Sequence, residues 1–265
     1  MSVYRLKSWK NGVKSAKCWT FWLVVCCSIC LPVAAKTVVQ PRENPQADLQ
    51  QDQQQHKLET QYAAQLKKRQ WLKAQQSIES LLVNYASSQN ASLYKLELMY
   101  TQYRQAEYTL AAETAAEYLS MYPHDTYRDY AAYMQALSLY NAYQSNTQQR
   151  WRLYLGSHDN ENLLAAEQAI NLILTHHPQS RYYAQSVGLL EKVHSTLAQQ
   201  NIDIARSYFD RKAYLASLSR LNEAMMYAHS KKPLLQILTT MAANYAALDM
   251  AEQRKGIEQI IKMNR

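Results

Sequence analysis

The residue types that most often carry catalysis or bind metals are present in this chain, but they are scattered. His176 and His177 are adjacent, so they point to different faces of a helix and make a poor pair of metal ligands. The sequence contains no glycine-rich phosphate loop, no GxSxG nucleophile motif and no DxDxDG calcium loop. We therefore predict that the protein is not an enzyme and holds no cofactor or metal. The seven histidines are His56, His124, His158, His176, His177, His194 and His229.

The four cysteines could supply thiol chemistry, but all of them lie within the first 35 residues. Basic residues without any acid precede an apolar run over 19–33, and Val33-Ala34-Ala35 supplies the small residues of a cleavage site. This order is typical of a secretory signal peptide. We predict that residues 1–35 are removed on export and that the mature chain, beginning at Lys36, has no thiol. The cysteines are Cys18, Cys26, Cys27 and Cys30.

Two other fates of this segment stay open. An uncleaved membrane anchor needs about 20 apolar residues, and Pro32 interrupts the run. Lipid attachment at Cys26 is the second, because Leu23 stands at the spacing of a bacterial lipobox. Val25, however, occupies a position where a lipobox has a small residue. We therefore expect a mature chain without a lipid.

Beyond the leader, one pattern recurs along the chain. From Leu96 to Pro123 it reads as two apolar-periodic helices joined by a tight turn, with Ala111 twelve residues before the proline. Two spacings between copies, 74 to 111 and 216 to 251, are close to the repeat of about 34 residues in tetratricopeptide (TPR) proteins. Helix pairs of this kind stack because each has a face that it cannot bury alone. The other copies start at Ala74, Ala166, Ala216 and Ala251.

These observations predict an all-α TPR solenoid of about five helix-turn-helix units over residues 58–265. Residues 36–57 are Gln-rich with two prolines, which predicts a linker, and we expect the first helix to begin at His56. Residues 144–161 are not repeat-like, so we expect the third unit to be interrupted by a loop. Its Trp151, Tyr154 and Leu155 either pack back onto the solenoid or form a binding patch. The stretch 180–212, almost free of Pro and Gly, predicts a long helix joining units three and four.

Arg220 stands out against this repeat. Four residues after the leading alanine, the first three units carry Ile78, Ala115 and Ile170, whereas the fourth carries Arg220. An unpaired buried guanidinium is costly. Two interpretations follow: Arg220 pairs with an acid inside the array, such as Asp203 or Asp210, or it reaches the carboxylate of a partner protein.

The net charge of +8 invites a nucleic-acid interpretation. Five cations and no acid lie in residues 1–35, so the remaining chain carries only 8 − 5 = +3. We therefore expect no nucleic-acid partner.

Several stretches resemble the BamD (YfiO/ComL) family, the TPR component of the bacterial outer-membrane β-barrel assembly machinery. The resemblance covers about residues 58–263, and the run Asp129-Tyr130-Ala131-Ala132-Tyr133-Met134 and the spacing of the interruption are its most specific parts. Other matching stretches are WLKAQQSIESLLVNYA (71–86), LELMYTQYRQAEYTLA (96–111), HPQSRYYAQSV (177–187) and IARSYFDRKAYLASLSRLNEAM (204–225).

The resemblance implies a non-catalytic scaffold in the periplasm, at the inner face of the outer membrane of a Gram-negative bacterium. It implies that the C-terminal units dock the periplasmic POTRA region of the barrel insertase, with the family's interface arginine at Arg220. It also implies contacts with other subunits of the machinery. The N-terminal units would receive unfolded outer-membrane proteins, with Tyr85, Tyr103 and Tyr122 as candidate groove residues. The alternative is another periplasmic TPR adaptor, serving division or peptidoglycan-linked machinery.

Overall fold

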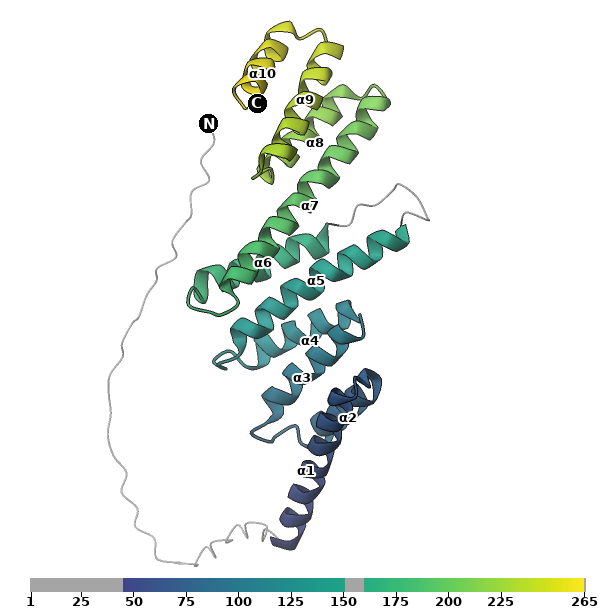
Figure 1. Ribbon diagram of the computed structural model, residues 1–265, viewed down its shortest axis with the longest axis vertical. Helices are drawn as coiled ribbons and strands as arrows, with labels where there is room; N and C mark the ends of the chain where they lie inside the picture. Colours follow the sequence, from purple (N-terminus) through teal and green to yellow (C-terminus); the bar gives the residue numbers. More distant parts are fainter. Residues whose placement is uncertain (1–44, 151–159, 265) are drawn as a thin grey trace, which may run out of the picture. The chain divides into compact units, whose positions relative to one another are not determined.

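The structure is a computed structural model, and it describes residues 45–150 and 160–264. The predicted signal peptide, the predicted cleavage site and residues 36–44 lie outside the described residues, as do Trp151, Tyr154 and Leu155. The described parts belong to one compact unit, Asn44–Arg265, and every regular element in them is an α-helix (Figure 1). The all-α prediction is confirmed.

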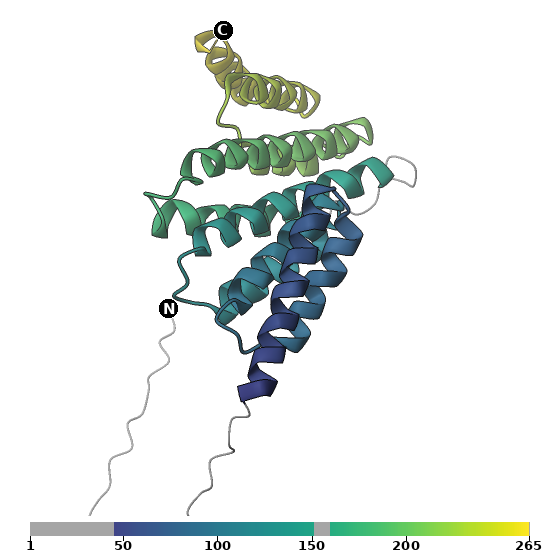
Figure 2. The same cartoon turned by 60° about the horizontal axis from the view of Figure 1, so that its bottom comes forward.

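Ten helices follow one another along the described chain, and each packs against the next (Figures 1 and 2). The first helices of successive units also contact one another, in the pairs α3–α5, α5–α7 and α7–α9. The helices are α1 (Pro45–Lys67), α2 (Trp71–Asn84), α3 (Ala91–Arg104), α4 (Tyr108–Met121), α5 (Arg128–Arg150), α6 (Glu161–His176), α7 (Tyr183–Asp210), α8 (Tyr214–Met226), α9 (Lys231–Ala247) and α10 (Ala251–Met263).

Four tight turns share one backbone geometry and divide the helices into pairs. One residue in each turn has a positive φ: Arg69 at 54°, Ala106 at 62°, Lys212 at 62° and Asp249 at 57°. The N–H of the next residue donates to the carbonyl five positions earlier, at 2.9 to 3.0 Å in all four turns. This is the hydrogen bond by which a left-handed residue ends a helix. With α5–α6 as the interrupted pair, the chain therefore has the five helix-turn-helix units that were predicted.

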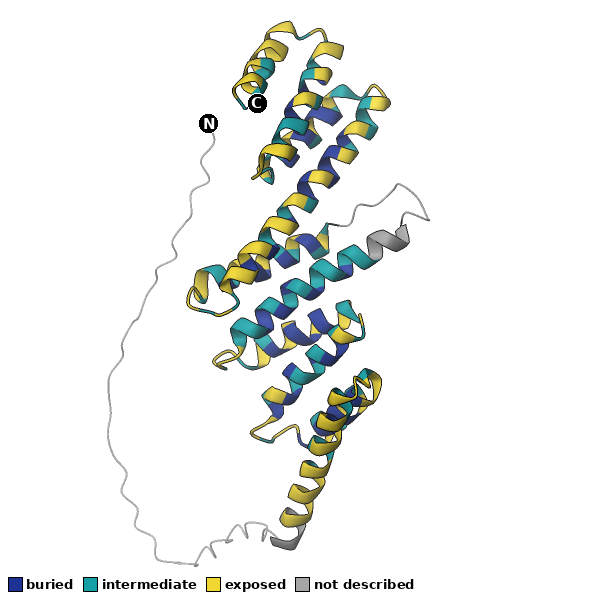
Figure 3. Ribbon diagram, in the orientation of Figure 1, coloured by how far each residue is buried: buried dark blue, intermediate teal, exposed yellow. Residues whose placement is uncertain are grey.

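Four apolar clusters hold the stack together, and each is shared between neighbouring units. The first joins α1, α2 and α3 around Ile78 and Leu81, and the second joins α3, α4 and α5 around Met99 and Tyr118. The third joins α5, α6 and α7, and the fourth joins α7, α8 and α9. Figure 3 shows this pattern as buried residues along the helix faces that meet, with exposed residues covering much of α1 and α10. A unit therefore completes its core with a neighbour, as expected of a repeat array.

The first helix begins earlier than predicted. It starts at Pro45, not His56, so residues 45–57 are helical and the predicted linker ends before them. Glutamine is a good helix former, and polar contacts replace the missing apolar ones. Gln55 Nε2 donates to the Tyr94 hydroxyl at 2.6 Å, and the Tyr85 hydroxyl donates to the Gln51 carbonyl at 3.3 Å.

The third unit is interrupted over a shorter stretch than predicted. The interruption was expected over residues 144–161, but α5 continues to Arg150 and α6 begins at Glu161. Residues 144–150 are rich in Gln and polar residues, which weakens apolar periodicity but does not prevent a helix. The long helix predicted over 180–212 is α7, the 28-residue first helix of unit four.

The repeat register of unit four differs by one residue from the prediction. Ser217 and Leu221 are fully buried, whereas Ala216 and Arg220 are only half-buried. Ser217 stands three residues into α8, as Ala74 does in α2 and Ala111 in α4. Because the fourth unit has Ser217 where the first two have Ala74 and Ala111, a search for alanine did not find this register. Arg220 therefore does not occupy a core position, and the argument from a broken apolar pattern does not hold.

Candidate functional site

Partly buried tyrosines of two successive units, Tyr103 of α3 and Tyr130 and Tyr133 of α5, pack against the same apolar cluster. Tyr130 and Tyr133 of α5 both lie against Tyr182, the residue that precedes α7, with ring centroids 5.5 and 5.2 Å apart. The rings of Tyr133 and Tyr182 are nearly parallel, at 14°. All three side chains are half-buried, so each keeps part of its ring in solvent. We call Tyr100, Tyr103, Tyr130, Tyr133 and Tyr182 the aromatic surface.

The surface extends from α5 toward α3. Tyr103 accepts a hydrogen bond from Asn141 Nδ2 of α5 at 3.0 Å. Burial, and then the nearby Tyr182 and Glu97, raise the pKa of Tyr130 well above its ordinary value. Burial raises the pKa of Tyr133 as well. A tyrosine hydroxyl is protonated at neutral pH even at its ordinary pKa of about 10, so these hydroxyls can donate hydrogen bonds, and the raised pKa values extend this to more alkaline pH.

Charges lie within this surface and at both of its ends. Glu97 of α3 accepts a hydrogen bond from the Tyr62 hydroxyl of α1. The exposed Arg181 guanidinium lies 4.8 Å from the ring centre of Tyr182. At the other end Arg104 lies 4.4 Å from the ring centre of Trp71, and its Nη1 donates to the Tyr100 hydroxyl at 2.8 Å. Cations held over aromatic faces are fixed in direction, so both ends of the surface present oriented positive charge.

The three groove candidates from the sequence occupy different environments. Tyr103 belongs to the aromatic surface. Tyr122 follows α4 and packs its ring 5.1 Å from that of Tyr118, in the same cluster as Tyr103. Tyr85 follows α2 in the first cluster and is only 6% exposed, so its ring supports the fold. Sequence analysis missed Tyr100 and Tyr182, although it had singled out the run that contains Tyr130 and Tyr133.

Arg220 lies on the surface of α8, away from the core. Its guanidinium pairs with Glu223 one turn along the same helix, with Nη1 2.7 Å from Oε2, and its side chain is 38% exposed. Neither acid proposed from the sequence is its partner: Asp203 pairs with Arg206 at 3.6 Å, and none of the ion pairs among the described residues involves Asp210. Arg220 is therefore accessible to a partner protein, provided that the partner's acid competes with Glu223.

Other polar groups among the described residues do not form a catalytic or metal-binding site that we can identify. His194 Nε2 lies 2.9 Å from Glu167 Oε1, and its ring centre is 4.8 Å from that of His229. Within the described ranges, no group of three or more His, Cys, Asp or Glu residues could hold a metal ion. Among these same residues, every helix is too short or too polar to cross a bilayer.

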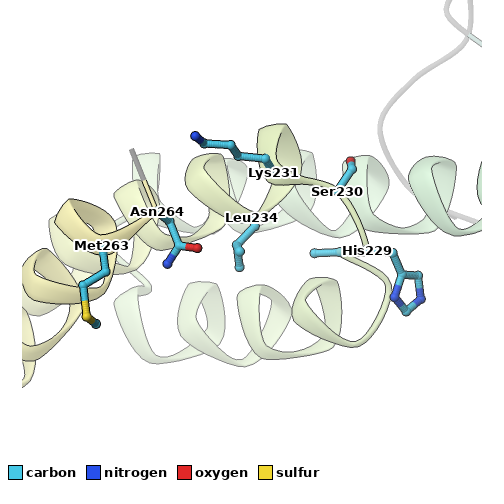
Figure 4. Close-up of a pocket in the computed structure, with 7 residues that line it drawn as sticks. His229, Ser230, Lys231, Leu234, Met263 and Asn264 are labelled. Carbon is cyan, nitrogen blue, oxygen red and sulfur yellow. The ribbon is translucent and has the colours of Figure 1, made fainter.

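Two pockets lie at the ends of helices. One, of about 400 Å³, lies between the α8–α9 link and the end of α10 (Figure 4), where Leu234 and Met263 line it together with polar residues of the link. The other, of about 460 Å³, lies between the α4–α5 turn and the end of α6. Arg128 lines this pocket, but its Nη1 already donates hydrogen bonds to the carbonyls of Leu119 and Tyr122, at 2.6 and 3.1 Å. Neither pocket is lined by tyrosines of the aromatic surface, so we take the aromatic surface as the candidate site.

Comparison with known proteins connects this array to one family. Residues 51–260 match the YfiO family, described as an outer membrane lipoprotein. The chain is 22% identical over 218 residues to the "Outer membrane protein assembly factor BamD" of Neisseria gonorrhoeae, covering 82% of each chain. It is 26% identical over 160 residues to the protein of that name from Xylella fastidiosa, covering 59% of this chain and 54% of the relative. The relative from Buchnera aphidicola is 23% identical over 172 residues, covering 64% of this chain and 70% of the relative.

The matched range begins inside α1 and ends inside α10, so it contains parts of all five units and the whole of the aromatic surface. The resemblance noted from the sequence is confirmed. This chain belongs to the YfiO (BamD) family.

Proposed function

We propose that this chain is a non-catalytic scaffold of the outer-membrane β-barrel assembly machinery. The observation that carries the proposal is the family match over residues 51–260, together with relatives that are named outer membrane protein assembly factors. In this proposal the chain is exported by its N-terminal segment and acts in the periplasm, at the inner face of the outer membrane. It docks the insertase and other subunits of the machinery, and it receives unfolded barrel proteins.

The aromatic surface is the proposed site for those unfolded chains. A strand of a barrel protein alternates apolar and polar side chains, with aromatic residues near its ends. Tyrosine rings offer apolar area at a small entropic cost, and their hydroxyls can bond to an extended backbone. The cations Arg104 and Arg181 at the two ends of the surface suit carboxylates of the bound segment, including a C-terminal one.

Arg220 is the proposed contact to the insertase. Its exposure and its position on α8, in the C-terminal half of the array, support this role. Because Glu223 already pairs with it, binding exchanges one acid for another. The gain is therefore smaller than for an unpaired guanidinium. Arg220→Ala should weaken binding of the purified POTRA region in a calorimetric titration, Arg220→Lys should weaken it less, and Glu223→Gln should preserve or strengthen it. Equal binding by all four proteins would remove Arg220 from the interface.

Depletion of the protein tests the proposed function as a whole. If the chain serves barrel assembly, β-barrel proteins should disappear from the outer membrane before growth stops, as measured by quantitative proteomics of that membrane. Intact barrels, accompanied by a division or cell-wall defect, would instead favour an adaptor of other envelope machinery.

The substrate surface has its own test. We expect a peptide from a barrel strand, with alternating aromatic residues, to bind the purified protein. Tyr182→Ala should weaken that binding roughly three- to tenfold, since an aromatic contact is worth about a kcal/mol. Tyr183→Ala is the matched control, because Tyr183 is the adjacent tyrosine, is 38% exposed and lies outside the surface as defined. Equal losses in the two variants, or none in either, would contradict the assignment.

A further inference from the structure

The turn between α1 and α2 carries the densest run of positive charge in the described chain. Lys67, Lys68, Arg69 and Lys73 lie within seven residues, and no acid occurs between Glu59 and Glu79. All four side chains are exposed. Arg69 has a positive φ and stands at the turn itself. The cations therefore lie at the end of the first helix pair, where α1 turns into α2, and are open to solvent.

These charges are not neutralised within the described part of the chain. Its ion pairs involve other residues. The acids nearest to the turn do not pair with its cations. Glu79 Oε1 accepts a hydrogen bond from Gln75 at 2.9 Å, and Glu107, in the neighbouring α3–α4 turn, has one carboxylate oxygen that is buried without a hydrogen-bond partner. The turn thus presents uncompensated positive charge to solvent.

A fifth cation is added from the next unit. Arg104, at the end of α3, is exposed, and its guanidinium lies 4.4 Å from the ring centre of Trp71, the first residue of α2. Trp71 in turn meets Tyr100 edge-on at 6.2 Å. The stack holds Arg104 beside the turn, so the positive charge comes from two units and does not depend on one flexible segment.

An apolar residue stands among the cations. Leu72 is 62% exposed, immediately after Trp71 and before Lys73. In water this exposure is unfavourable. At the surface of a lipid bilayer it is favourable, because the leucine can enter the boundary between headgroups and acyl chains while the surrounding cations bind phosphates.

The corresponding turn of unit four provides a contrast. Between α7 and α8 lie Arg211 and Lys212, and Leu215 occupies the place of Leu72 and is 70% exposed. Here, however, Asp210 adjoins the cations. An exposed leucine is thus common to the two turns, and the uncompensated charge distinguishes the first.

We propose that the α1–α2 turn, with Arg104, binds the headgroups of anionic phospholipids at a membrane surface. The lysine and arginine side chains donate to lipid phosphates, and Leu72 inserts between headgroups. An acidic protein surface would satisfy the cations, but it would not bury the exposed leucine that adjoins them in the sequence. The proposal does not depend on a role in barrel assembly.

Vesicle co-sedimentation tests this directly. For this experiment the protein is produced from Lys36 onward. It then lacks the apolar segment 19–33 but keeps the whole compact unit Asn44–Arg265 and its four clusters. We expect it to bind vesicles of phosphatidylethanolamine with about 30% phosphatidylglycerol at least about tenfold more tightly than vesicles of phosphatidylcholine alone. Salt of about 0.5 M should remove most of this difference.

Variants assign the binding to the turn. The triple variant Lys67→Gln/Lys68→Gln/Lys73→Gln should lose about tenfold or more in affinity for the anionic vesicles. Arg211→Gln/Lys212→Gln, in the equivalent turn of unit four, should lose less than about threefold. Leu72→Ser should weaken binding more than Leu215→Ser does. Equal binding to neutral and anionic vesicles, or equal losses in the two charge variants, would overturn the proposal. Failure to bind vesicles, with retention of a polyglutamate peptide that the triple variant loses, would overturn it in favour of an acidic protein partner.

Discussion

At the level of single residues, two tyrosine–glutamate hydrogen bonds fasten α1 to α3. The Tyr62 hydroxyl donates to Glu97 and the Tyr94 hydroxyl donates to Glu59, in both cases across 35 residues of sequence. Burial first, and then the hydrogen bond to Glu97, raise the pKa of Tyr62 far above its ordinary value. The pKa of Tyr94 is raised in the same way, by burial and then by Glu59. Hydrogen bonds to charged groups are stronger than neutral ones, which compensates for the few apolar residues of α1.

The register of α8 leads to a prediction about two adjacent residues. Leu221 is fully buried in the cluster shared by α7, α8 and α9, so Leu221→Ala should lower the free energy of unfolding by about 2–5 kcal/mol. Arg220→Ala removes only an exposed pair within one helix, so it should cost about 0.2–1 kcal/mol. Urea unfolding followed by circular dichroism would compare the two. A larger loss from Arg220→Ala would mean that the predicted register was right and the observed one wrong.

This pair of residues also shows where sequence reasoning about the site stopped. A fully buried small residue near the start of the second helix is alanine in the first three units (Ala74, Ala111 and Ala166) and serine in the fourth (Ser217). A search for alanine therefore chose Ala216, one residue too early. Exposure of Arg220 and its pairing with Glu223 depend on which way α8 faces, and a single-residue shift turns a helix by about 100°.

At the level of elements, the four tight turns hold a non-glycine residue in a left-handed conformation. For an L-amino acid this conformation costs about 1–2 kcal/mol. The turn is kept because it directs the second helix of each pair back along the first, so that their apolar faces meet. In all four of these units, the packing of the two helices offsets the backbone strain at the turn.

Replacing one of these turn residues with glycine should stabilise the array. Ala106 is exposed, has a φ of 62° and lies between α3 and α4. Ala106→Gly removes the strain and adds some entropy to the unfolded chain, for a net gain of about 0.5–1 kcal/mol. Ala106→Val should destabilise, because a β-branched side chain tolerates a positive φ poorly. Thermal unfolding of the two variants should move the midpoint in opposite directions, and shifts of the same sign would contradict this account of the turns.

Sequence patterns predicted the elements well where apolar residues recur, and less well where they do not. The two helices expected between Leu96 and Pro123 are α3 and α4, and the long helix expected over 180–212 is α7. The early part of α1 and the end of α5 were missed, because both are rich in glutamine and polar residues. Gln51 and Gln55 contribute to α1 through hydrogen bonds with Tyr85, which follows α2, and with Tyr94 of α3. Contacts of this kind leave no periodicity in the sequence.

For the molecule as a whole, two buried tyrosines, Tyr62 and Tyr118, and the half-buried Tyr130 predict a sensitivity to alkali. Burial raises the pKa of Tyr62, Tyr118 and Tyr130 above the ordinary value of about 10. Their contribution to stability is therefore fully present below pH 10. It is lost as the pH rises above 10, by roughly 1.4 kcal/mol per pH unit for each tyrosine that stays protonated in the fold.

Tyrosinate absorbance and helicity, followed together during an alkaline titration, would test this. We expect some of the 21 tyrosines to ionise near pH 10 while the helices persist. The remainder should ionise only at higher pH, together with the loss of helicity. Tyr118→Phe, which removes one hydroxyl from the second cluster, should reduce the second phase by about one tyrosine. Ionisation of every tyrosine near pH 10 with the helices intact would contradict the burial described here.

The packing of each helix against its neighbours in the chain has a consequence for how the protein opens. Interactions between sequence neighbours close small loops, so segments can unfold and refold without crossing the barrier for the whole chain. The outermost helices have neighbours on one side only, and α10 has no buried residue along its described length. Amide hydrogen exchange would therefore be fastest in α1 and α10 and slowest around α5 and α7. A protein bound at one end would slow exchange at that end first, so the pattern of protection would report which end of the array holds which partner.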